Sequence, residues 1–208
     1  MAFLLLVRHG ENDYLKKGRL PGRTAGIHLN ERGRDQAAAL AQSLGKLPIK
    51  AIYSSPLERA VETAEPIAQA LKLEIQLNPG LLDTHVGKWE GAELKKLYKK
   101  PLWKIVQAAP SRVRFPQGES FLELQTRVVN AIESIQSAHK KEFVAVIFHA
   151  DPIKLAVAYY LGLPMDSFQK LMVDAGSVSM LALGDSGARL IALNLKPPFE
   201  FKLPTKKK

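Results

Sequence analysis

The chain opens with the stretch Phe3-Leu4-Leu5-Leu6-Val7-Arg8-His9-Gly10-Glu11. Its five consecutive apolar residues are typical of a strand buried on both faces, as in the centre of an α/β sheet. Arg8 and His9 follow at the strand end, and Gly10 allows the backbone to turn. Ligands of open α/β sheets bind outside the carboxyl ends of the strands. Arg8 and His9 are therefore candidates for a functional site. Taken alone, the pair fits a solvated basic strand end better, and later features of the sequence change this balance.

Composition restricts the class of protein. The 208 residues are enough for one well-buried α/β domain, and the 46% hydrophobic content excludes a disordered chain. The absence of cysteine excludes disulfides, a thiol nucleophile and a zinc–thiolate site. It also fits a cytosolic protein, so we expect a cytoplasmic location. No apolar stretch is long enough for a signal sequence or a membrane span, and no membrane association is expected.

The net charge of +10 favours an anionic partner. The basic residues are not interleaved with exposed aromatic residues, as stacking on single-stranded nucleic acid would require. A small phosphorylated metabolite is therefore the expected partner, and no nucleic acid is expected. Part of the charge lies in residues 198–208, which we expect to form a basic, flexible tail, and part in a basic loop over residues 12–29 that contains Arg19.

The first half of the chain then alternates helix and strand signals. Asn30 is the expected N-cap of a helix that Gly45 and Pro48 end. A short strand over 51–54 runs into Ser55-Pro56-Leu57-Glu58, which combines a serine cap, an early proline and a glutamate that completes a capping box. The helix predicted at this junction carries Arg59 in its first turn, just above the end of the strand.

The second half repeats these signals. Ser120-Phe121-Leu122-Glu123 is another capping box, and it predicts a long helix to about His139. The apolar run 143–148 predicts a second doubly buried strand that ends at His149. Asp151-Pro152 is expected to cap and start the next helix, and residues 178–183 and 190–195 predict a closing strand pair.

This alternation predicts a three-layer α/β/α fold with a mostly parallel central sheet. We expect a single domain over residues 1–208. Residues 84–116 break the pattern, because they hold short, lysine-rich amphipathic pieces between irregular stretches. We expect them to form a small helical cap inserted over the edge of the sheet.

Four residues of compatible chemistry are expected at one rim of the sheet: the strand-end histidines His9 and His149, with Arg8 and Arg59. Arginines supply forked donors that suit phosphate or carboxylate oxygens. A neutral histidine can act as a nucleophile, and a second can donate a hydrogen bond to developing negative charge. The set predicts phosphoryl transfer through a phosphohistidine. A metal site at His9, His149 and Asp83 is not expected, because arginines beside the histidines would repel a cation. No cofactor is expected either.

An ordered series of motifs resembles the histidine phosphatase superfamily, which has a phosphoglycerate mutase-like fold and includes cofactor-dependent phosphoglycerate mutases and many phosphatases. Arg8-His9-Gly10 alone is a weak signal, but the order of the motifs over nearly the whole chain is specific. They are Arg8-His9-Gly10-Glu11, Leu29-Asn30-Glu31-Arg32-Gly33 with Gln36-Ala37, Ser54-Ser55-Pro56-Leu57-Glu58-Arg59-Ala60, Gly87-Lys88-Trp89-Glu90-Gly91, and His149. The resemblance implies the phosphoglycerate mutase-like fold, with His9 as the phosphorylated nucleophile. It also implies that the phosphoryl group is held by Arg8, Arg59 and His149.

Two positions depart from the family's usual pattern. The general acid is usually a glutamate a few residues before the G-x-W-E-G stretch, and Asp83 stands there. Asp83 is therefore the expected proton donor, and His85 is the alternative. Many members carry a phosphate-binding asparagine six residues after the nucleophile, where this chain has Leu15. We expect Asn12 to compensate, or else the phosphate to be held by one donor fewer, and we expect Arg19 to be a further phosphate ligand.

The leading hypothesis is a metal-independent phosphomonoester hydrolase that acts through a phosphohistidine on a small phosphorylated metabolite. One alternative is a phosphoglycerate mutase-type phosphotransferase, against which the modest size of the predicted cap argues. Another is a catalytically weak member that binds phosphate ligands, which the residues at positions 15 and 83 suggest. The sequence names no substrate, and it leaves the oligomeric state open, with a dimer among the options.

Overall fold

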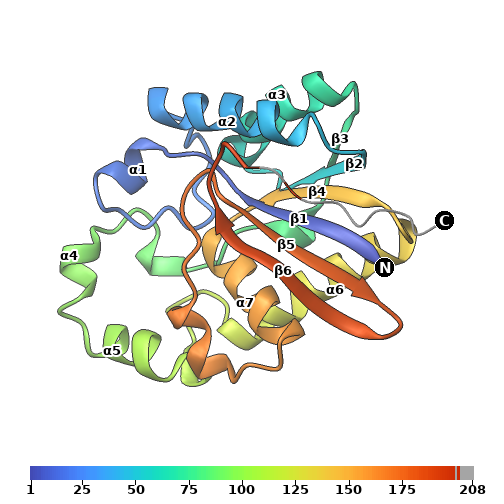
Figure 1. Ribbon diagram of the computed structural model, residues 1–208. Coiled ribbons are helices and arrows are strands. Elements are labelled where there is room, and N and C mark those ends of the chain that lie inside the picture. Colours follow the sequence, from blue (N-terminus) through green and yellow to red (C-terminus); the bar gives the residue numbers. More distant parts are fainter. Residues whose placement is uncertain (200, 202–208) are drawn as a thin grey trace.

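The computed structural model describes residues 1–199 and 201, and it is built around a six-stranded sheet in the order β3-β2-β4-β1-β5-β6 (Figure 1). Neighbouring strands from β3 to β1 are parallel, and β5 and β6 add an antiparallel edge. The predicted mostly parallel sheet is therefore confirmed. The strands are β1 (Ala2–Arg8), β2 (Ile49–Ser54), β3 (Ile75–Leu77), β4 (Phe143–Phe148), β5 (Val178–Gly184) and β6 (Gly187–Leu195).

Helices cover both faces of the sheet, as the predicted three-layer fold requires (Figure 1). On one face lie α2 (Glu31–Leu44) and α3 (Glu58–Leu71), and on the other α6 (Phe121–Ala138) and α7 (Ala150–Tyr160). Successive side chains of β1 point to opposite faces. Leu5 and Val7 join the core beneath α2 and α3, whereas Leu4 and Leu6 join the core beneath α6 and α7. This explains why the first strand reads as a continuous apolar run.

Short helical segments occupy the connections. The predicted loop over 12–29 contains a four-residue helix, α1 (Asp13–Lys16), which Asn12 caps. Within the expected insertion over 84–116, α4 (Leu94–Leu97) and α5 (Pro101–Ala108) lie to one side of the sheet (Figure 1). The 3₁₀ segments are η1 (Pro79–Leu81), η2 (Gly87–Trp89), η3 (Pro110–Arg112) and η4 (Met165–Lys170).

Two of the four predicted helix caps are confirmed. The Asn30 side chain accepts a hydrogen bond from Gly33 N at the start of α2, and Ser120 with Glu123 forms a complete capping box at the start of α6. The other two were wrong. The helix α3 begins only at Glu58, with no side-chain cap, and the Ser55 hydroxyl instead contacts His149.

The predicted cap at Asp151 was also wrong, because His149 occupies the N-cap position of α7 and Asp151 is the second helical residue. The Asp151 carboxylate forms an ion pair with Lys154, one turn further along the helix, at 2.8 Å.

The basic tail expected over residues 198–208 falls largely on residues 200 and 202–208, which lie outside the described residues. Among the described helices, none is long and apolar enough to cross a membrane.

Candidate active site

Three adjacent parallel strands, β1, β4 and β2, end side by side. The backbone hydrogen bonding between these strands continues one residue past the strand ends. His9 N donates to Phe148 O at 3.0 Å, and Ser55 N donates to Ile147 O at 2.9 Å. The two histidine rings therefore meet edge to face, with centroids 5.2 Å apart. The convergence predicted for His9 and His149 is present in the structure.

The His9 imidazole is buried, and its orientation is set by its own backbone. Its Nδ1 lies 2.7 Å from Gly10 O, and a carbonyl can only accept, so Nδ1 carries the hydrogen. Nε2 then holds the lone pair. Burial lowers the pKa of His9 well below its usual value, and the charges of Arg59 and Arg8 lower it further. The ring is therefore neutral at pH 7, which a nucleophile requires.

The glycine after His9 brings the turn against the start of α2. A Cβ on Gly10 would lie 2.5 Å from Gly33 O, and one on Gly33 would lie 2.0 Å from Glu11 O, so neither position has room for a side chain. Gly10 N also donates to the Thr63 hydroxyl on α3 at 3.0 Å. These contacts hold the His9 turn between two helices.

Arg59 and Arg8 both carry buried side-chain donors that have no partner in the described chain. Arg59 is completely buried, and its Nη2 donates to Gly22 O at 2.7 Å and to Asp83 Oδ2 at 3.1 Å. Its Nε and Nη1 have no hydrogen-bond partner in the described part of the chain, and neither has Arg8 Nε. Buried donors of charged groups without acceptors are costly, so the pair is suited to an anion that supplies several oxygens.

His149 is buried between Ser55 and Asp83. Its Nε2 lies 2.9 Å from Ser55 Oγ, and its Nδ1 lies 3.5 Å from Asp83 Oδ2 without a hydrogen-bond partner among the described residues. If the serine hydroxyl donates to Nε2, Nδ1 carries the hydrogen and can donate to a bound oxygen. Burial, and then the charge of Arg59, lower the pKa of His149 well below its usual value.

Asp83 joins the same cluster from the segment after β3. Burial raises the pKa of its carboxyl, and the positive charge of Arg59 partly offsets this effect. Its backbone carbonyl accepts hydrogen bonds from Arg23 Nε at 2.9 Å and from Arg127 Nη2 at 3.3 Å. Glu119 forms ion pairs with both arginines, so the position of Asp83 is clamped from two sides.

The other predicted site residues differ in where they lie. The His85 backbone N–H donates to Glu119 Oε1 and its carbonyl accepts from Glu119 N, so this residue belongs to the clamp. Asn12 is completely buried and its Oδ1 accepts from Leu15 N, which leaves Nδ2 without a partner in the described chain. Arg19 donates to Gly91 O and its guanidinium lies over the Tyr14 ring. No recorded contact among the described residues joins Arg19 to the histidines or to Asp83.

Sequence reasoning missed Ser55 and the clamp of Arg23, Glu119 and Arg127. Ser55 was named only within a capping pattern and a family motif, without a role at the site. The clamp residues belong to no motif: Arg23 and Arg127 bind a backbone carbonyl, and Glu119 pairs with both arginines. No group of three or more histidine, aspartate or glutamate residues in the described chain could hold a metal ion.

We expect Ser55→Ala to lower kcat/KM by about tenfold, because a lost hydrogen bond to an imidazole costs on the order of 1 kcal/mol and frees the other tautomer of His149. Steady-state rates on one phosphomonoester measure this effect, and Ser111→Ala, a surface serine, is the matched control. An unchanged kcat/KM in Ser55→Ala would show that the serine does not orient His149.

The chain is similar in sequence to known proteins over most of its length. The family model described as "Histidine phosphatase superfamily (branch 1)" matches residues 4–196. "Phosphoserine phosphatase 1" of Hydrogenobacter thermophilus is 31% identical over 198 residues, which cover 94% of this chain and 93% of that protein. The "Metal-independent phosphoserine phosphatase" of Arabidopsis thaliana is 36% identical over 188 residues, which cover 88% of this chain and 76% of that protein.

Solved structures agree with the sequence comparisons. The crystal structure of a phosphoserine phosphatase from Entamoeba histolytica, in complex with 3-phosphoglyceric acid, superposes with a TM-score of 0.85 at 26% identity. The match covers 95% of this chain and 98% of that one. The phosphoglycerate mutase-like fold expected from the sequence is therefore confirmed.

Proposed function

The chain belongs to the histidine phosphatase superfamily, and from this membership and the geometry of its site we propose that it hydrolyses small phosphate monoesters without a metal, through a phosphohistidine at His9. One observation carries the proposal most strongly. A neutral, buried His9 lies beside two arginines that hold unpaired donors, so a nucleophile and an anion site share one rim. This combination suits attack on a phosphoryl group.

The first step forms one bond and breaks another. His9 Nε2 attacks phosphorus in line, the bond to the ester oxygen breaks, and Asp83 donates a proton to the departing oxygen. The raised pKa of Asp83 supports this role, because the carboxyl keeps its proton at a higher pH than usual. In the second step water attacks the phosphohistidine, Asp83 accepts the water proton, and inorganic phosphate leaves.

The transferred phosphoryl oxygens need donors throughout both steps. We assign them to Arg8 Nε, Arg59 Nε and Nη1, and His149 Nδ1, all of which lack partners among the described residues. The buried Asn12 Nδ2 also lacks a partner and supports its predicted role as a substitute for the asparagine that Leu15 replaces. The predicted role of Arg19 has no such support, because its side chain contacts Gly91 and Tyr14 instead.

A panel of phosphorylated metabolites tests the proposal through release of inorganic phosphate, with and without a chelator. We expect release at equal rates in both conditions. The products formed from 3-phosphoglycerate are separated and identified as well, because a mutase would form an isomer of this substrate instead of free phosphate. Binding of phosphate ligands without turnover would indicate the catalytically weak alternative. The single domain over 1–208 and the cytoplasmic location stay predictions.

Arg59→Ala is expected to lower kcat/KM by about 10- to 150-fold, since charged hydrogen bonds contribute roughly 1.5–3 kcal/mol each and this side chain is completely buried. Arg59→Lys should restore only part of the loss, because an ammonium lacks the planar fork. Thermal melting of both variants separates loss of fold from loss of phosphate binding. Unchanged catalytic efficiency in Arg59→Ala would place this arginine outside the phosphate site.

The pH profile of kcat/KM follows from the two pKa shifts. Because its pKa is lowered, His9 stays neutral below pH 6.5. The decline of kcat/KM on the acid side should therefore be centred well below pH 6.5. A raised pKa keeps Asp83 protonated to a higher pH, and its deprotonation then produces the alkaline limb for alkyl esters. An optimum on the acidic side of neutrality is expected in rates measured from pH 4 to 9. An acid limb centred above about 6.5 would contradict a buried, neutral His9.

A further inference from the structure

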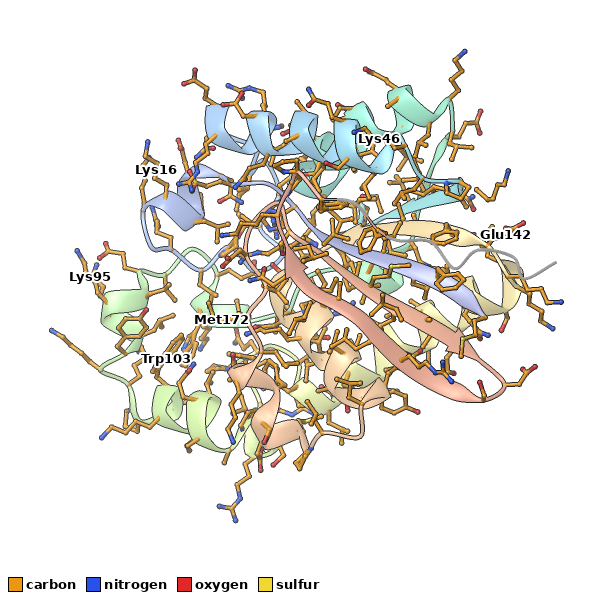
Figure 2. All side chains as sticks on the ribbon, viewed as in Figure 1. Lys16, Lys46, Lys95, Trp103, Glu142 and Met172 are labelled. Atoms are coloured by element: carbon orange, nitrogen blue, oxygen red, sulfur yellow. The ribbon has the colours of Figure 1, made fainter. Side chains whose placement is uncertain are left out.

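A cavity of about 160 Å³ lies against Asp83, and the proposed mechanism assigns it no role. Asp83 lines it, as do the buried Thr84 and Trp103 of α5, which Figure 2 labels. A proton donor must touch the ester oxygen, so the group attached to that oxygen extends into the space that Asp83 lines. The cavity is therefore the candidate site for the leaving alcohol.

The cavity has an unusual charge pattern for a protein of net charge +10. Its charged lining residues in the described chain are two carboxylates, Asp83 and Asp151. Burial raises the pKa of Asp83, and the negative charge of Asp151, which lines the same cavity, raises it further. The amides of Gln107 and Gln169 complete the polar lining.

One cation, Lys154, forms an ion pair with Asp151 itself. Its Nζ lies 2.8 Å from Asp151 Oδ1 and 2.7 Å from Gln169 Oε1, and it sits over the Phe168 ring at 5.2 Å from the centroid. Of the two carboxylate oxygens of Asp151, this ion pair involves Oδ1. No recorded contact among the described residues engages Asp151 Oδ2, which is left as an acceptor.

We propose that this cavity selects a leaving alcohol that carries an ammonium group, with Asp151 as the residue that determines this specificity. The inference rests on the proposed function. The substrate is then the phosphomonoester of a small amino alcohol, whose phosphate binds Arg8 and Arg59 while its ammonium binds Asp151 Oδ2. The aromatic wall at Trp103 accommodates a cation. A carboxylate on the alcohol would face Asp151 and Asp83, and like charges repel.

Three esters of matched length test the proposal: 2-aminoethyl phosphate, propyl phosphate and carboxymethyl phosphate. We expect kcat/KM to fall in that order, with about a tenfold preference for aminoethyl over propyl phosphate, the value of one charge-assisted hydrogen bond at a partly exposed site. 4-Nitrophenyl phosphate is the reference, because its hydrolysis reports the proposed function independently. No hydrolysis of any ester would overturn that function, whereas hydrolysis with carboxymethyl phosphate preferred would overturn only the inference.

Asp151→Asn assigns the preference to its residue. The ratio of the aminoethyl to the propyl rate should fall to near unity in this variant, each rate being normalised to 4-nitrophenyl phosphate. Asp35→Asn, which removes the same charge from the exposed surface of α2, should keep the wild-type ratio. An aminoethyl-to-propyl ratio that is unchanged in Asp151→Asn would exclude Asp151 as the determinant of specificity. The series of three esters on the wild-type enzyme tests the preference itself, so poor folding of the variant does not prevent the test.

Discussion

Replacing His9 by alanine is expected to reduce phosphate release by about 10⁴–10⁶-fold, the range found when a member of a hydrolase's nucleophilic machinery is removed. The reason is geometric and chemical together. His9 Nδ1 is bound to Gly10 O, so Nε2 is the only basic nitrogen of this ring, and the ring is neutral because burial lowers its pKa. Alanine removes the atom to which the phosphoryl group would be transferred.

Single-turnover and steady-state rates on one alkyl and one aryl ester measure the loss, and thermal melting verifies the fold. His28→Ala is the matched control, because His28 is an exposed histidine that pairs with Glu62 at the surface. Retention of full activity in His9→Ala would rule out the mechanism.

Asp83→Asn is expected to reduce the rate on alkyl phosphates by about 10²–10⁴-fold, the usual contribution of a positioned general acid. The amide is almost isosteric with the carboxyl and can still accept the hydrogen bond from Arg59 Nη2, now 3.1 Å long. It cannot give up a proton to the departing oxygen. Aryl phosphates have a good leaving group that needs little protonation, so their phosphorylation step should lose much less.

The measurement is a pair of rate ratios, variant over wild type, for an alkyl ester and 4-nitrophenyl phosphate under single-turnover conditions. Asp83→Glu, which keeps a carboxyl, should retain activity. Equal losses on the two esters would mean that Asp83 is structural. His85 would then be the next acid to test, although the structure directs its backbone into the contacts with Glu119.

The strands and the convergence of the two strand-end histidines were predictable from the sequence. Runs such as 3–7 and 143–148 are apolar without alternation because the sheet buries both of their faces. Parallel strands place their carboxyl ends at one edge, so residues that follow two such runs converge. That reasoning brought His9 and His149 together although 140 positions separate them in the chain.

The capping errors show where local patterns stop being informative. Ser55 and Ser120 each precede a glutamate by three positions, yet only Ser120 forms a capping box. Ser55 differs because β4 brings His149 to within 2.9 Å of its hydroxyl, and a contact across 94 residues leaves no trace in a four-residue pattern. The Ser55 hydroxyl also accepts a long hydrogen bond from Leu57 N, at 3.4 Å, but no capping box forms.

The clamp around Asp83 was not predictable for a related reason. Arg23 and Arg127 bind the carbonyl of Asp83, and any residue at position 83 would offer the same carbonyl. Recognition of a backbone atom imposes no residue type on the recognised position, so neither spacing nor composition reveals it. The same holds for Gly22 O, to which Arg59 donates.

The proposal that His9 carries the phosphoryl group is tested most directly by trapping the intermediate. In Asp83→Asn, attack on 4-nitrophenyl phosphate needs little acid, but hydrolysis of the phosphohistidine lacks its base, so the intermediate should accumulate. We predict a stoichiometric burst of nitrophenolate, followed by an alkali-stable, acid-labile phosphoprotein whose phosphoryl group maps to His9 by mass spectrometry. Phosphate release without a burst and without any phosphoprotein, or a phosphoryl group on another residue, would contradict the mechanism.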